Sequence, residues 1–131
     1  MIQSNELRIG NYVYRTNKHT KEKIIMQLTA SCILDISSNG INSSFIYEPI
    51  QLTEEILLKC GFEERINSSM VKFWNKNNFT IYHEYYKHNV VDNLEWFFLS
   101  SADFDRLRIY SLHQLQNLYF ALTNQELEIN L

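Results

Sequence analysis

The chain has 131 residues, of which 45% are hydrophobic and 14% aromatic, and its formal net charge at pH 7 is −3. This length is typical of one domain with a sizeable core. The acidic balance disfavours a nonspecific nucleic-acid binder, which needs a basic surface, and no apolar run approaches the roughly 20 residues of a membrane-spanning helix.

The two cysteines and the first residues of the chain indicate the cellular compartment. Cys32 and Cys60 lie far apart, without the close spacing of a zinc site, and two lone thiols are typical of a reducing environment. The first residues lack the basic segment and apolar run of a secretory signal. We therefore expect a soluble, cytoplasmic protein.

Short alternating segments predict a sheet in the first fifty residues. Residues 11–15 alternate as a strand, and apolar residues of one parity recur over residues 24–36, which predicts one bent strand or two strands. Asn39 and Gly40 form a type I′ hairpin signal, after which residues 41–47 return as the partner strand. Together these segments predict a curved antiparallel sheet resembling an SH3-like barrel.

A short helix is expected after Pro49. Thr53 is a suitable N-cap, Glu54 and Glu55 occupy the first turn, where the helix dipole favours anions, and Gly61 closes the helix. Four further strands are expected at residues 71–74, 79–86, 94–99 and 107–110, separated by Asn-rich or charged turns. Their order predicts an antiparallel meander.

Residues 112–123 carry the clearest helical pattern of the chain. Five apolar residues recur at helical spacing and make one stripe: Leu112, Leu115, Leu118, Tyr119 and Leu122. Ser111 and Gln114 fit a capping box, and Asn124 fits the left-handed residue that closes a helix. We expect this helix to pack across the meander, which gives an α+β fold in a single domain, 1–131, with lobes at about 1–62 and 63–131.

No group of residues carries a catalytic or metal-binding signature. His83 and His88 stand at i and i+5 in a Tyr-rich strand pattern, whereas a zinc-protease helix needs histidines at i and i+4. Ser111 and His113 lack a nucleophile elbow, and the three glycines are isolated, so they form no phosphate-binding loop. We therefore predict a non-enzymatic protein with no catalytic residue, no cofactor and no metal.

The aromatic residues of the middle segment have two interpretations. Four of them are candidates for exposed anchors at a protein interface: Tyr82, Tyr85, Tyr86 and Trp96. However, residues 94–99 are apolar on both faces, which is also typical of a buried central strand. Arg106 and Arg108 share one face of the next strand and could meet phosphate or carboxylate groups, or simply face solvent.

Three blocks of the sequence resemble a family of small uncharacterised bacterial and prophage proteins. They are residues 5–13 (NELRIGNYV), residues 47–62 with YEPIQLTEE and LLKCGF, and residues 113–123 (HQLQNLYFALT) followed by Glu126 and Leu127. In that family a glycine commonly stands where this chain has Asn124. The resemblance implies a phage or prophage setting, and it implies no activity and no catalytic residue.

These observations predict a phage-type module that binds a larger protein partner. Its most concrete form is an inhibitor of a host defence nuclease of the CRISPR type, because a small acidic protein is suited to a basic nucleic-acid groove. Its expected partner-binding residues are Tyr82, Tyr86, Trp96, Arg106 and Arg108. The alternative is a nucleic-acid-associated accessory factor that uses the face with Arg106 and Arg108.

Overall fold

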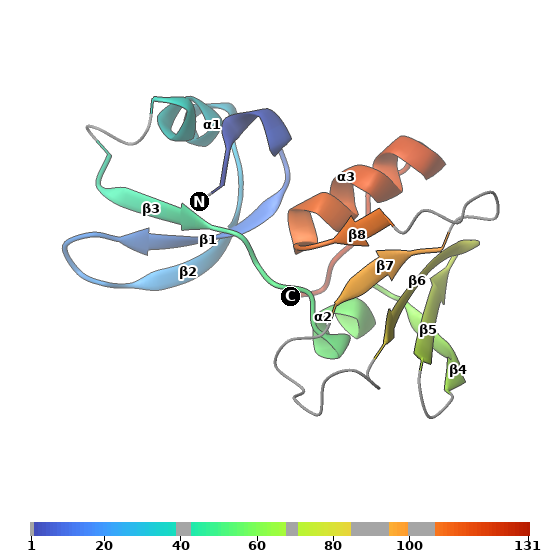
Figure 1. Cartoon of the computed structure of the whole chain (residues 1–131). Helices are drawn as coiled ribbons and strands as arrows, with labels where there is room; N and C mark the ends of the chain where they lie inside the picture. The colour runs from blue at the N-terminus through green and yellow to red at the C-terminus, as the bar shows by residue number, and fades with distance from the viewer. Residues whose placement is uncertain (1, 39–42, 68–70, 85–94, 100–106) are drawn as a thin grey trace. The chain divides into compact units, whose positions relative to one another are not determined.

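The computed structural model describes residues 2–38, 43–67, 71–84, 95–99 and 107–131. These residues form two antiparallel sheets and three α-helices, which confirms the predicted α+β class (Figure 1). The chain divides into two units, which are described separately below. The first unit comprises Met1–Gln51 and Ser111–Thr123, and the second comprises Leu52–Tyr110 and Asn124–Leu131. None of the described helices is long and apolar enough to span a membrane.

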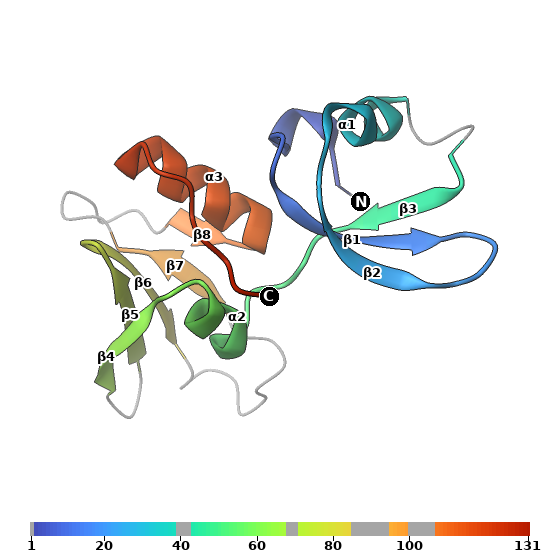
Figure 2. The ribbon, with the colours of Figure 1, turned by 180° about the vertical axis from the view of Figure 1, so that it is seen from behind.

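The sheet of the first unit has three strands in the order β2-β1-β3. These strands are β1 (Tyr12–Asn17), β2 (Lys23–Gln27) and β3 (Phe45–Glu48), and a short 3-10 helix, η1 (Ser4–Glu6), precedes them. Helix α1 (Ala30–Ser37) lies over one face of this sheet (Figures 1 and 2). Val13, Leu28 and Cys32 form the core between them together with Ile2.

Helix α1 replaces the strand that the alternation of residues 24–36 predicted beyond residue 29. The Thr29 side chain caps the helix by accepting a hydrogen bond from the backbone N–H of Cys32. Ile33 and Ile36 are three residues apart and pack against the core, which is the spacing of a helix face. The alternating prediction was therefore wrong for this half of the segment, and correct for β2.

The first sheet also differs from the predicted hairpin. Strand β3 pairs with β1, with Arg15 opposite Tyr47, and β2 pairs with the other side of β1. The turn predicted at Asn39 and Gly40 lies outside the described residues. The described strands form an open sheet and not an SH3-like barrel.

The second unit begins with α2 (Glu54–Lys59), where the sequence prediction is confirmed. The Thr53 hydroxyl accepts a hydrogen bond from the N–H of Ile56, and Gly61 closes the helix at φ +81°. The N–H of Phe62 donates to the carbonyl of Leu57, and both side chains are buried. The helix is thus fixed at both ends by its own neighbouring residues.

The sheet of the second unit is a five-stranded meander in the order β4-β5-β6-β7-β8. Its strands are β4 (Glu63–Asn67), β5 (Val71–Lys76), β6 (Phe79–Glu84), β7 (Trp96–Phe98) and β8 (Leu107–Ile109). The last four confirm the predicted strands, whereas β4 was not predicted. Asn77 and Asn78 both adopt positive φ in the turn between β5 and β6, a conformation that asparagine tolerates better than most residues.

Helix α3 spans Leu112–Thr123 as predicted, and Asn124 ends it with φ +57°. The helix belongs to the first unit, where it packs against β1. Leu112, Leu115 and Tyr119 are buried, but Leu122 is 56% exposed, so the apolar stripe faces the core except in the last turn of the helix. After Asn124 the chain rejoins the second unit, where Leu127 is buried and the N–H of Asn130 donates to the carbonyl of Lys59.

Candidate functional site

Trp96 is a core residue of the second unit, which corrects its prediction as an exposed anchor. Its side chain is 2% exposed, and its indole N–H donates a 3.1 Å hydrogen bond to the carbonyl of Leu52. The His83 ring packs on the indole with 4.5 Å between ring centroids. A side chain with both its ring and its polar group occupied inside the fold cannot reach a partner without unfolding.

Tyr82 stands in a row of aromatic rings on one face of the second sheet. Its ring centroid lies 5.7 Å from that of Phe73 and 5.5 Å from that of Phe97, on the two neighbouring strands. The side chain is half-buried. Cross-strand aromatic contacts of this kind stabilise the sheet. The other predicted anchors of this segment, Tyr85 and Tyr86, lie outside the described residues.

Arg108 lies exposed on β8, and two neighbouring side chains occupy its guanidinium group. Arg108 Nη2 is 3.3 Å from Glu95 Oε1, and the guanidinium carbon lies 4.5 Å from the centroid of the Tyr110 ring. The nearby carboxylate offsets the positive charge that a phosphate would need. Arg106, the second arginine of the predicted face, lies outside the described residues.

His83 forms part of a charged cluster at the edge of α2. Its Nε2 lies 3.1 Å from Glu54 Oε1, and the same oxygen accepts a 3.0 Å hydrogen bond from Lys72 Nζ. Lys72 also pairs with Glu64 at 3.3 Å. Burial lowers the pKa of His83, which Glu54 opposes. Among the described residues no group of three or more His, Cys, Asp or Glu side chains could hold a metal ion, and His88 lies outside them.

Ser111, His113 and Glu6 form a serine–histidine–acid arrangement in the first unit. Ser111 Oγ lies 3.0 Å from His113 Nδ1, and His113 Nε2 lies 3.7 Å from Glu6 Oε1. Ser111 and His113 are both buried, and burial lowers the pKa of His113 while Glu6 opposes this shift. A nucleophile must reach its substrate, and the buried Ser111 hydroxyl does not. We interpret the arrangement as structural.

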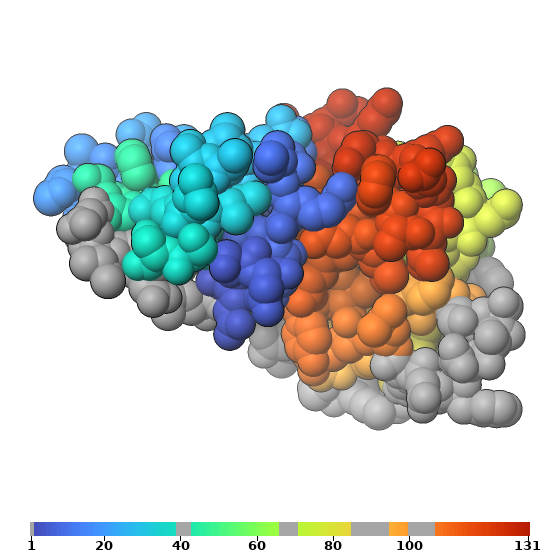
Figure 3. Space-filling model, turned by 90° about the horizontal axis from the view of Figure 1, so that it is seen from above, coloured from blue at the N-terminus to red at the C-terminus, as the bar shows by residue number. Residues whose placement is uncertain are grey.

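Gln116 and Asn117 of α3 tie the N-terminal segment to the helix. Asn117 Oδ1 accepts 2.9 Å hydrogen bonds from Arg8 Nε and Asn11 Nδ2, and Asn117 Nδ2 donates to the carbonyl of Glu6 at 2.8 Å. Gln116 accepts from one backbone group and donates to another in the same segment. Figure 3 shows the N-terminal segment, in dark blue, lying against α3, in orange.

We call this set of contacts the polar clasp: the side chains of Gln116 and Asn117 with the residues of 6–12 that they bond. Two of the three blocks that carry the family resemblance, residues 5–13 and 113–123, meet here. Their residues therefore have a structural explanation, because each bond joins positions more than 100 residues apart in the chain and fixes α3 on the first unit.

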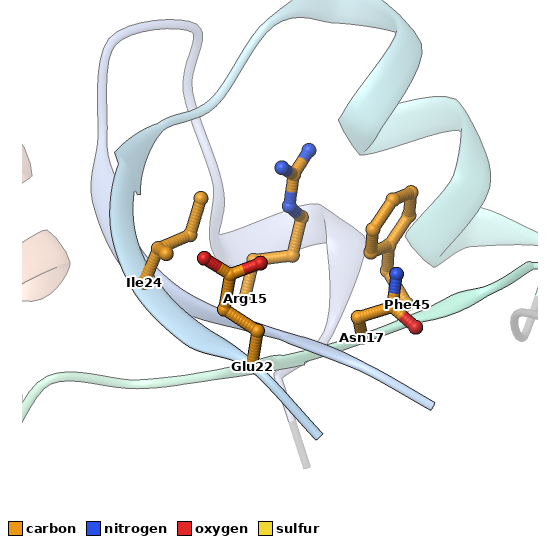
Figure 4. Close-up of a pocket in the computed structure, with 5 residues that line it drawn as sticks. All are labelled: Arg15, Asn17, Glu22, Ile24 and Phe45. Carbon is orange, nitrogen blue, oxygen red and sulfur yellow. The ribbon is translucent and has the colours of Figure 1, made fainter. Parts of the chain in front are cut away.

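A pocket of about 190 Å³ opens on the sheet face that α1 covers (Figure 4). Its lining residues come from β1, β2, β3 and the loop before β2: Arg15, Asn17, Glu22, Ile24 and Phe45. The Arg15 guanidinium carbon lies 4.2 Å from the centroid of the Phe45 ring. The pocket is smaller than the roughly 300–1,000 Å³ of typical small-molecule sites. We therefore assign it no cofactor.

Cys32 and Cys60, both free and buried, differ in their electrostatic surroundings. Burial alone would raise the pKa of Cys32, but hydrogen bonds with Thr29 and Tyr47 and the charge of Arg15 bring it below the usual value. Burial raises the pKa of Cys60 to about 12, so this thiol stays protonated at neutral pH. Sequence spacing gave no sign of this contrast, because Tyr47 and Arg15 are distant in the sequence and are brought to Cys32 by the fold.

The side of the first sheet opposite α1 presents a mixed apolar and aromatic surface. We call this surface the outer face. Its residues alternate with the core-facing residues of the three strands, and they are Tyr12, Tyr14, Thr16, Lys23, Ile25, Gln27, Ile46 and Glu48. Ile25 is 43% exposed and Ile46 48% exposed.

The centre of the outer face is organised around Tyr14. Ile25 and Glu48 flank Tyr14 on the neighbouring strands, and Lys23 Nζ lies 4.4 Å from the centroid of its ring. Lys23 also reaches across β1 to Glu48, with 3.0 Å between Nζ and Oε2. Sequence reasoning identified the strand but not this surface. The alternation of Tyr12 and Tyr14 with the buried Val13 was the available signal.

Comparison of the chain with family models, with curated proteins and with solved structures finds no match. Function is therefore inferred from the residues themselves.

Proposed function

We propose that this chain is a non-enzymatic protein-binding module, and that the outer face of its first sheet contacts the partner. The observation that carries the proposal is the exposure of Ile25 and Ile46 on the two edge strands, on either side of β1. The partner is a larger protein, and no membrane or cofactor takes part.

The composition of the outer face supports a protein partner. Interface cores are enriched in tyrosine and apolar side chains and surrounded by polar groups. Here two exposed isoleucines and Tyr14 stand beside the single ion pair between Lys23 and Glu48. Binding another protein to such a surface is favourable because it removes apolar area from water. A nucleic-acid backbone would find only Lys23 on this face, and Lys23 is already paired with Glu48.

The biological setting that we propose is a phage or prophage protein acting in the bacterial cytoplasm. The two free thiols support a reducing compartment. The partner that we propose is a nucleic-acid-guided defence nuclease of the CRISPR type, which this chain inhibits. The net charge of −3 supports this choice, because opposite charge speeds association with a basic groove.

The test is capture of the partner with matched variants. The chain and its Ile46→Lys variant are immobilised and exposed to host lysate, and retained proteins are identified and purified. We expect a nuclease that binds the wild type and loses activity on binding. We expect its affinity for Ile46→Lys to fall by roughly tenfold or more, because a charge would be buried in the interface. The control is Leu58→Lys, an equally drastic change at an exposed leucine of α2 in the second unit.

Equal binding by Ile46→Lys and wild type would reject the outer face as the contact surface. The nucleic-acid alternative predicts a different result: tight binding of bare DNA or RNA, weakened by added salt and by Arg108→Ala. The pairing of Arg108 with Glu95 argues against it, since that carboxylate competes with phosphate.

A further inference from the structure

Strand β2 ends the first sheet on one side, and no other strand among the described residues pairs with its outer edge. The strand reads Lys23-Ile24-Ile25-Met26-Gln27, and Ile24 and Ile25 are both more than a third exposed although they point to opposite faces. Natural sheets usually protect such an edge with lysine, proline, inward charge or a bulge, because it otherwise pairs with another chain. Strand β2 has no proline and carries a single charge, at its first position.

The direction of the free backbone groups follows from the hydrogen bonds at the two ends of β2. Glu22 accepts a bond from the N–H of Asn17, and the N–H of Leu28 donates to the carbonyl of Asn11, so both residues face β1. Because the direction alternates along a strand, the N–H and C=O groups of Lys23, Ile25 and Gln27 point away from the sheet.

We propose that a second copy of this chain pairs with β2 along this edge, forming a two-fold symmetric dimer with a continuous six-stranded sheet. The antiparallel register is centred on Ile25, which pairs with Ile25 of the second copy, and Lys23 pairs with Gln27. This register uses every outward-pointing N–H and C=O group of the strand, with up to about six hydrogen bonds between the copies.

The side chains of β2 are complementary to themselves in this register. On the outer face the two Ile25 side chains come together beside the two Tyr14 rings, and on the core face Ile24 meets Met26 of the other copy. No carboxylate lies within β2, and each Lys23 stands opposite a neutral glutamine. Although each copy has a net charge of −3, this pairing of the two β2 strands brings no two carboxylates opposite each other.

Strand β3, at the other edge of the sheet, fits a second copy less well. It has four residues, ends with Glu48 and is followed by Pro49, which cannot donate a hydrogen bond. A pair of five-residue strands buries less than the roughly 1,600 Å² of a standard protein interface. We therefore expect a dimer that forms as the protein concentration rises and not an obligate one. This dimer does not depend on the proposed partner.

The experiment is sedimentation velocity of the full chain from micromolar to near-millimolar concentration, with three variants. Ile25→Pro removes the central donor of the edge without removing a bond to β1, and Ile25→Lys places a charge where the two copies meet. Each is expected to weaken the dimer by roughly tenfold or more. Ile46→Lys makes the same change on the same face at the opposite edge, and it is expected to leave the dimer intact.

Amide hydrogen exchange gives a second measurement, which distinguishes loss of the dimer from a general loss of stability because it reports on single N–H groups. As the wild type dimerises, exchange at the N–H of Ile25 should slow, while the N–H of Ile24, already directed at β1, should change little. Three results would overturn the proposal: a monomer at every concentration, a dimer that survives both Ile25 variants, or a dimer that is lost equally in Ile46→Lys. Protection of Ile25 only when a different protein is added would assign the edge to that protein and also reject the dimer.

Discussion

Replacement of Asn117 by alanine tests the polar clasp directly. The side chain makes three hydrogen bonds of 2.8–2.9 Å, two from Arg8 and Asn11 to its oxygen and one from its amide to the carbonyl of Glu6. Each such bond contributes about 0.5–1.5 kcal/mol net, and these are partly exposed to water. We therefore expect Asn117→Ala to lower the free energy of unfolding of the first unit by about 2–3 kcal/mol.

Urea denaturation followed by two probes measures this effect. Both tryptophans, Trp74 and Trp96, lie in the second unit, so their fluorescence reports on that unit, whereas far-ultraviolet circular dichroism reports on both. The Asn117→Ala midpoint should fall in the dichroism signal at least as far as in the fluorescence. Asn130→Ala is the matched control, because the exposed Asn130 side chain lies outside the clasp. If Asn117→Ala and Asn130→Ala agree within about 0.5 kcal/mol, the clasp contributes nothing to stability.

The remaining predictions concern α3 and the buried histidines. Leu115→Ala should lower the free energy of unfolding by about 2–5 kcal/mol because it empties a buried site, whereas Leu122→Ala, at an exposed site, should change it by less than about 0.5 kcal/mol in the same denaturation assay. Burial lowers the pKa of both His83 and His113 from 6.5, so the unfolded chain binds more protons below that pH. Stability should therefore be full above about pH 6.5 and decline as the pH falls toward their folded-state pKa values, and a melting temperature unchanged between about pH 7.5 and pH 5.5 would contradict this. Asn124→Gly should raise the melting temperature, and Asn124→Ala should lower it, because only glycine adopts φ +57° without strain.

The elements that sequence reasoning predicted correctly are those whose signals are local. Helix α2 is capped by Thr53 and closed by Gly61, both within two residues of its ends. The termination of α3 at Asn124 is likewise decided by the residue itself. Such signals need no knowledge of the rest of the fold.

The sequence of helix α1 fits two secondary structures, a strand and a helix. Apolar residues at Cys32, Leu34 and Ile36 alternate as in a strand, and Ile33 and Ile36 are also spaced as on a helix. The Thr29 cap favours the helix, and Leu34 is left exposed as a result. Period alone cannot separate these two structures in so short a segment.

The surfaces of the chain depended on contacts between distant residues. The apolar pattern of α3 predicted a helix, but Gln116 and Asn117 attach it to the first unit through bonds to residues 6–12. Trp96 was a reasonable interface candidate from the sequence, but in the structure its indole N–H donates to the carbonyl of Leu52 inside the second unit. The exposure of each side chain depends on such contacts between distant residues. The sequence alone therefore identifies the aromatic residues but does not show which of them face solvent.

The order of the units along the chain has a consequence for biosynthesis. Residues 1–51 leave the ribosome first, yet the helix that completes their unit, Ser111–Thr123, is made after the whole meander of the second unit. The second sheet, contained within residues 63–109, can therefore pair while the earlier segment still lacks α3. Because Asn124–Leu131 belongs to the second unit, neither unit can be completed before residues 111–131 have been made, and the two units must finish folding nearly together.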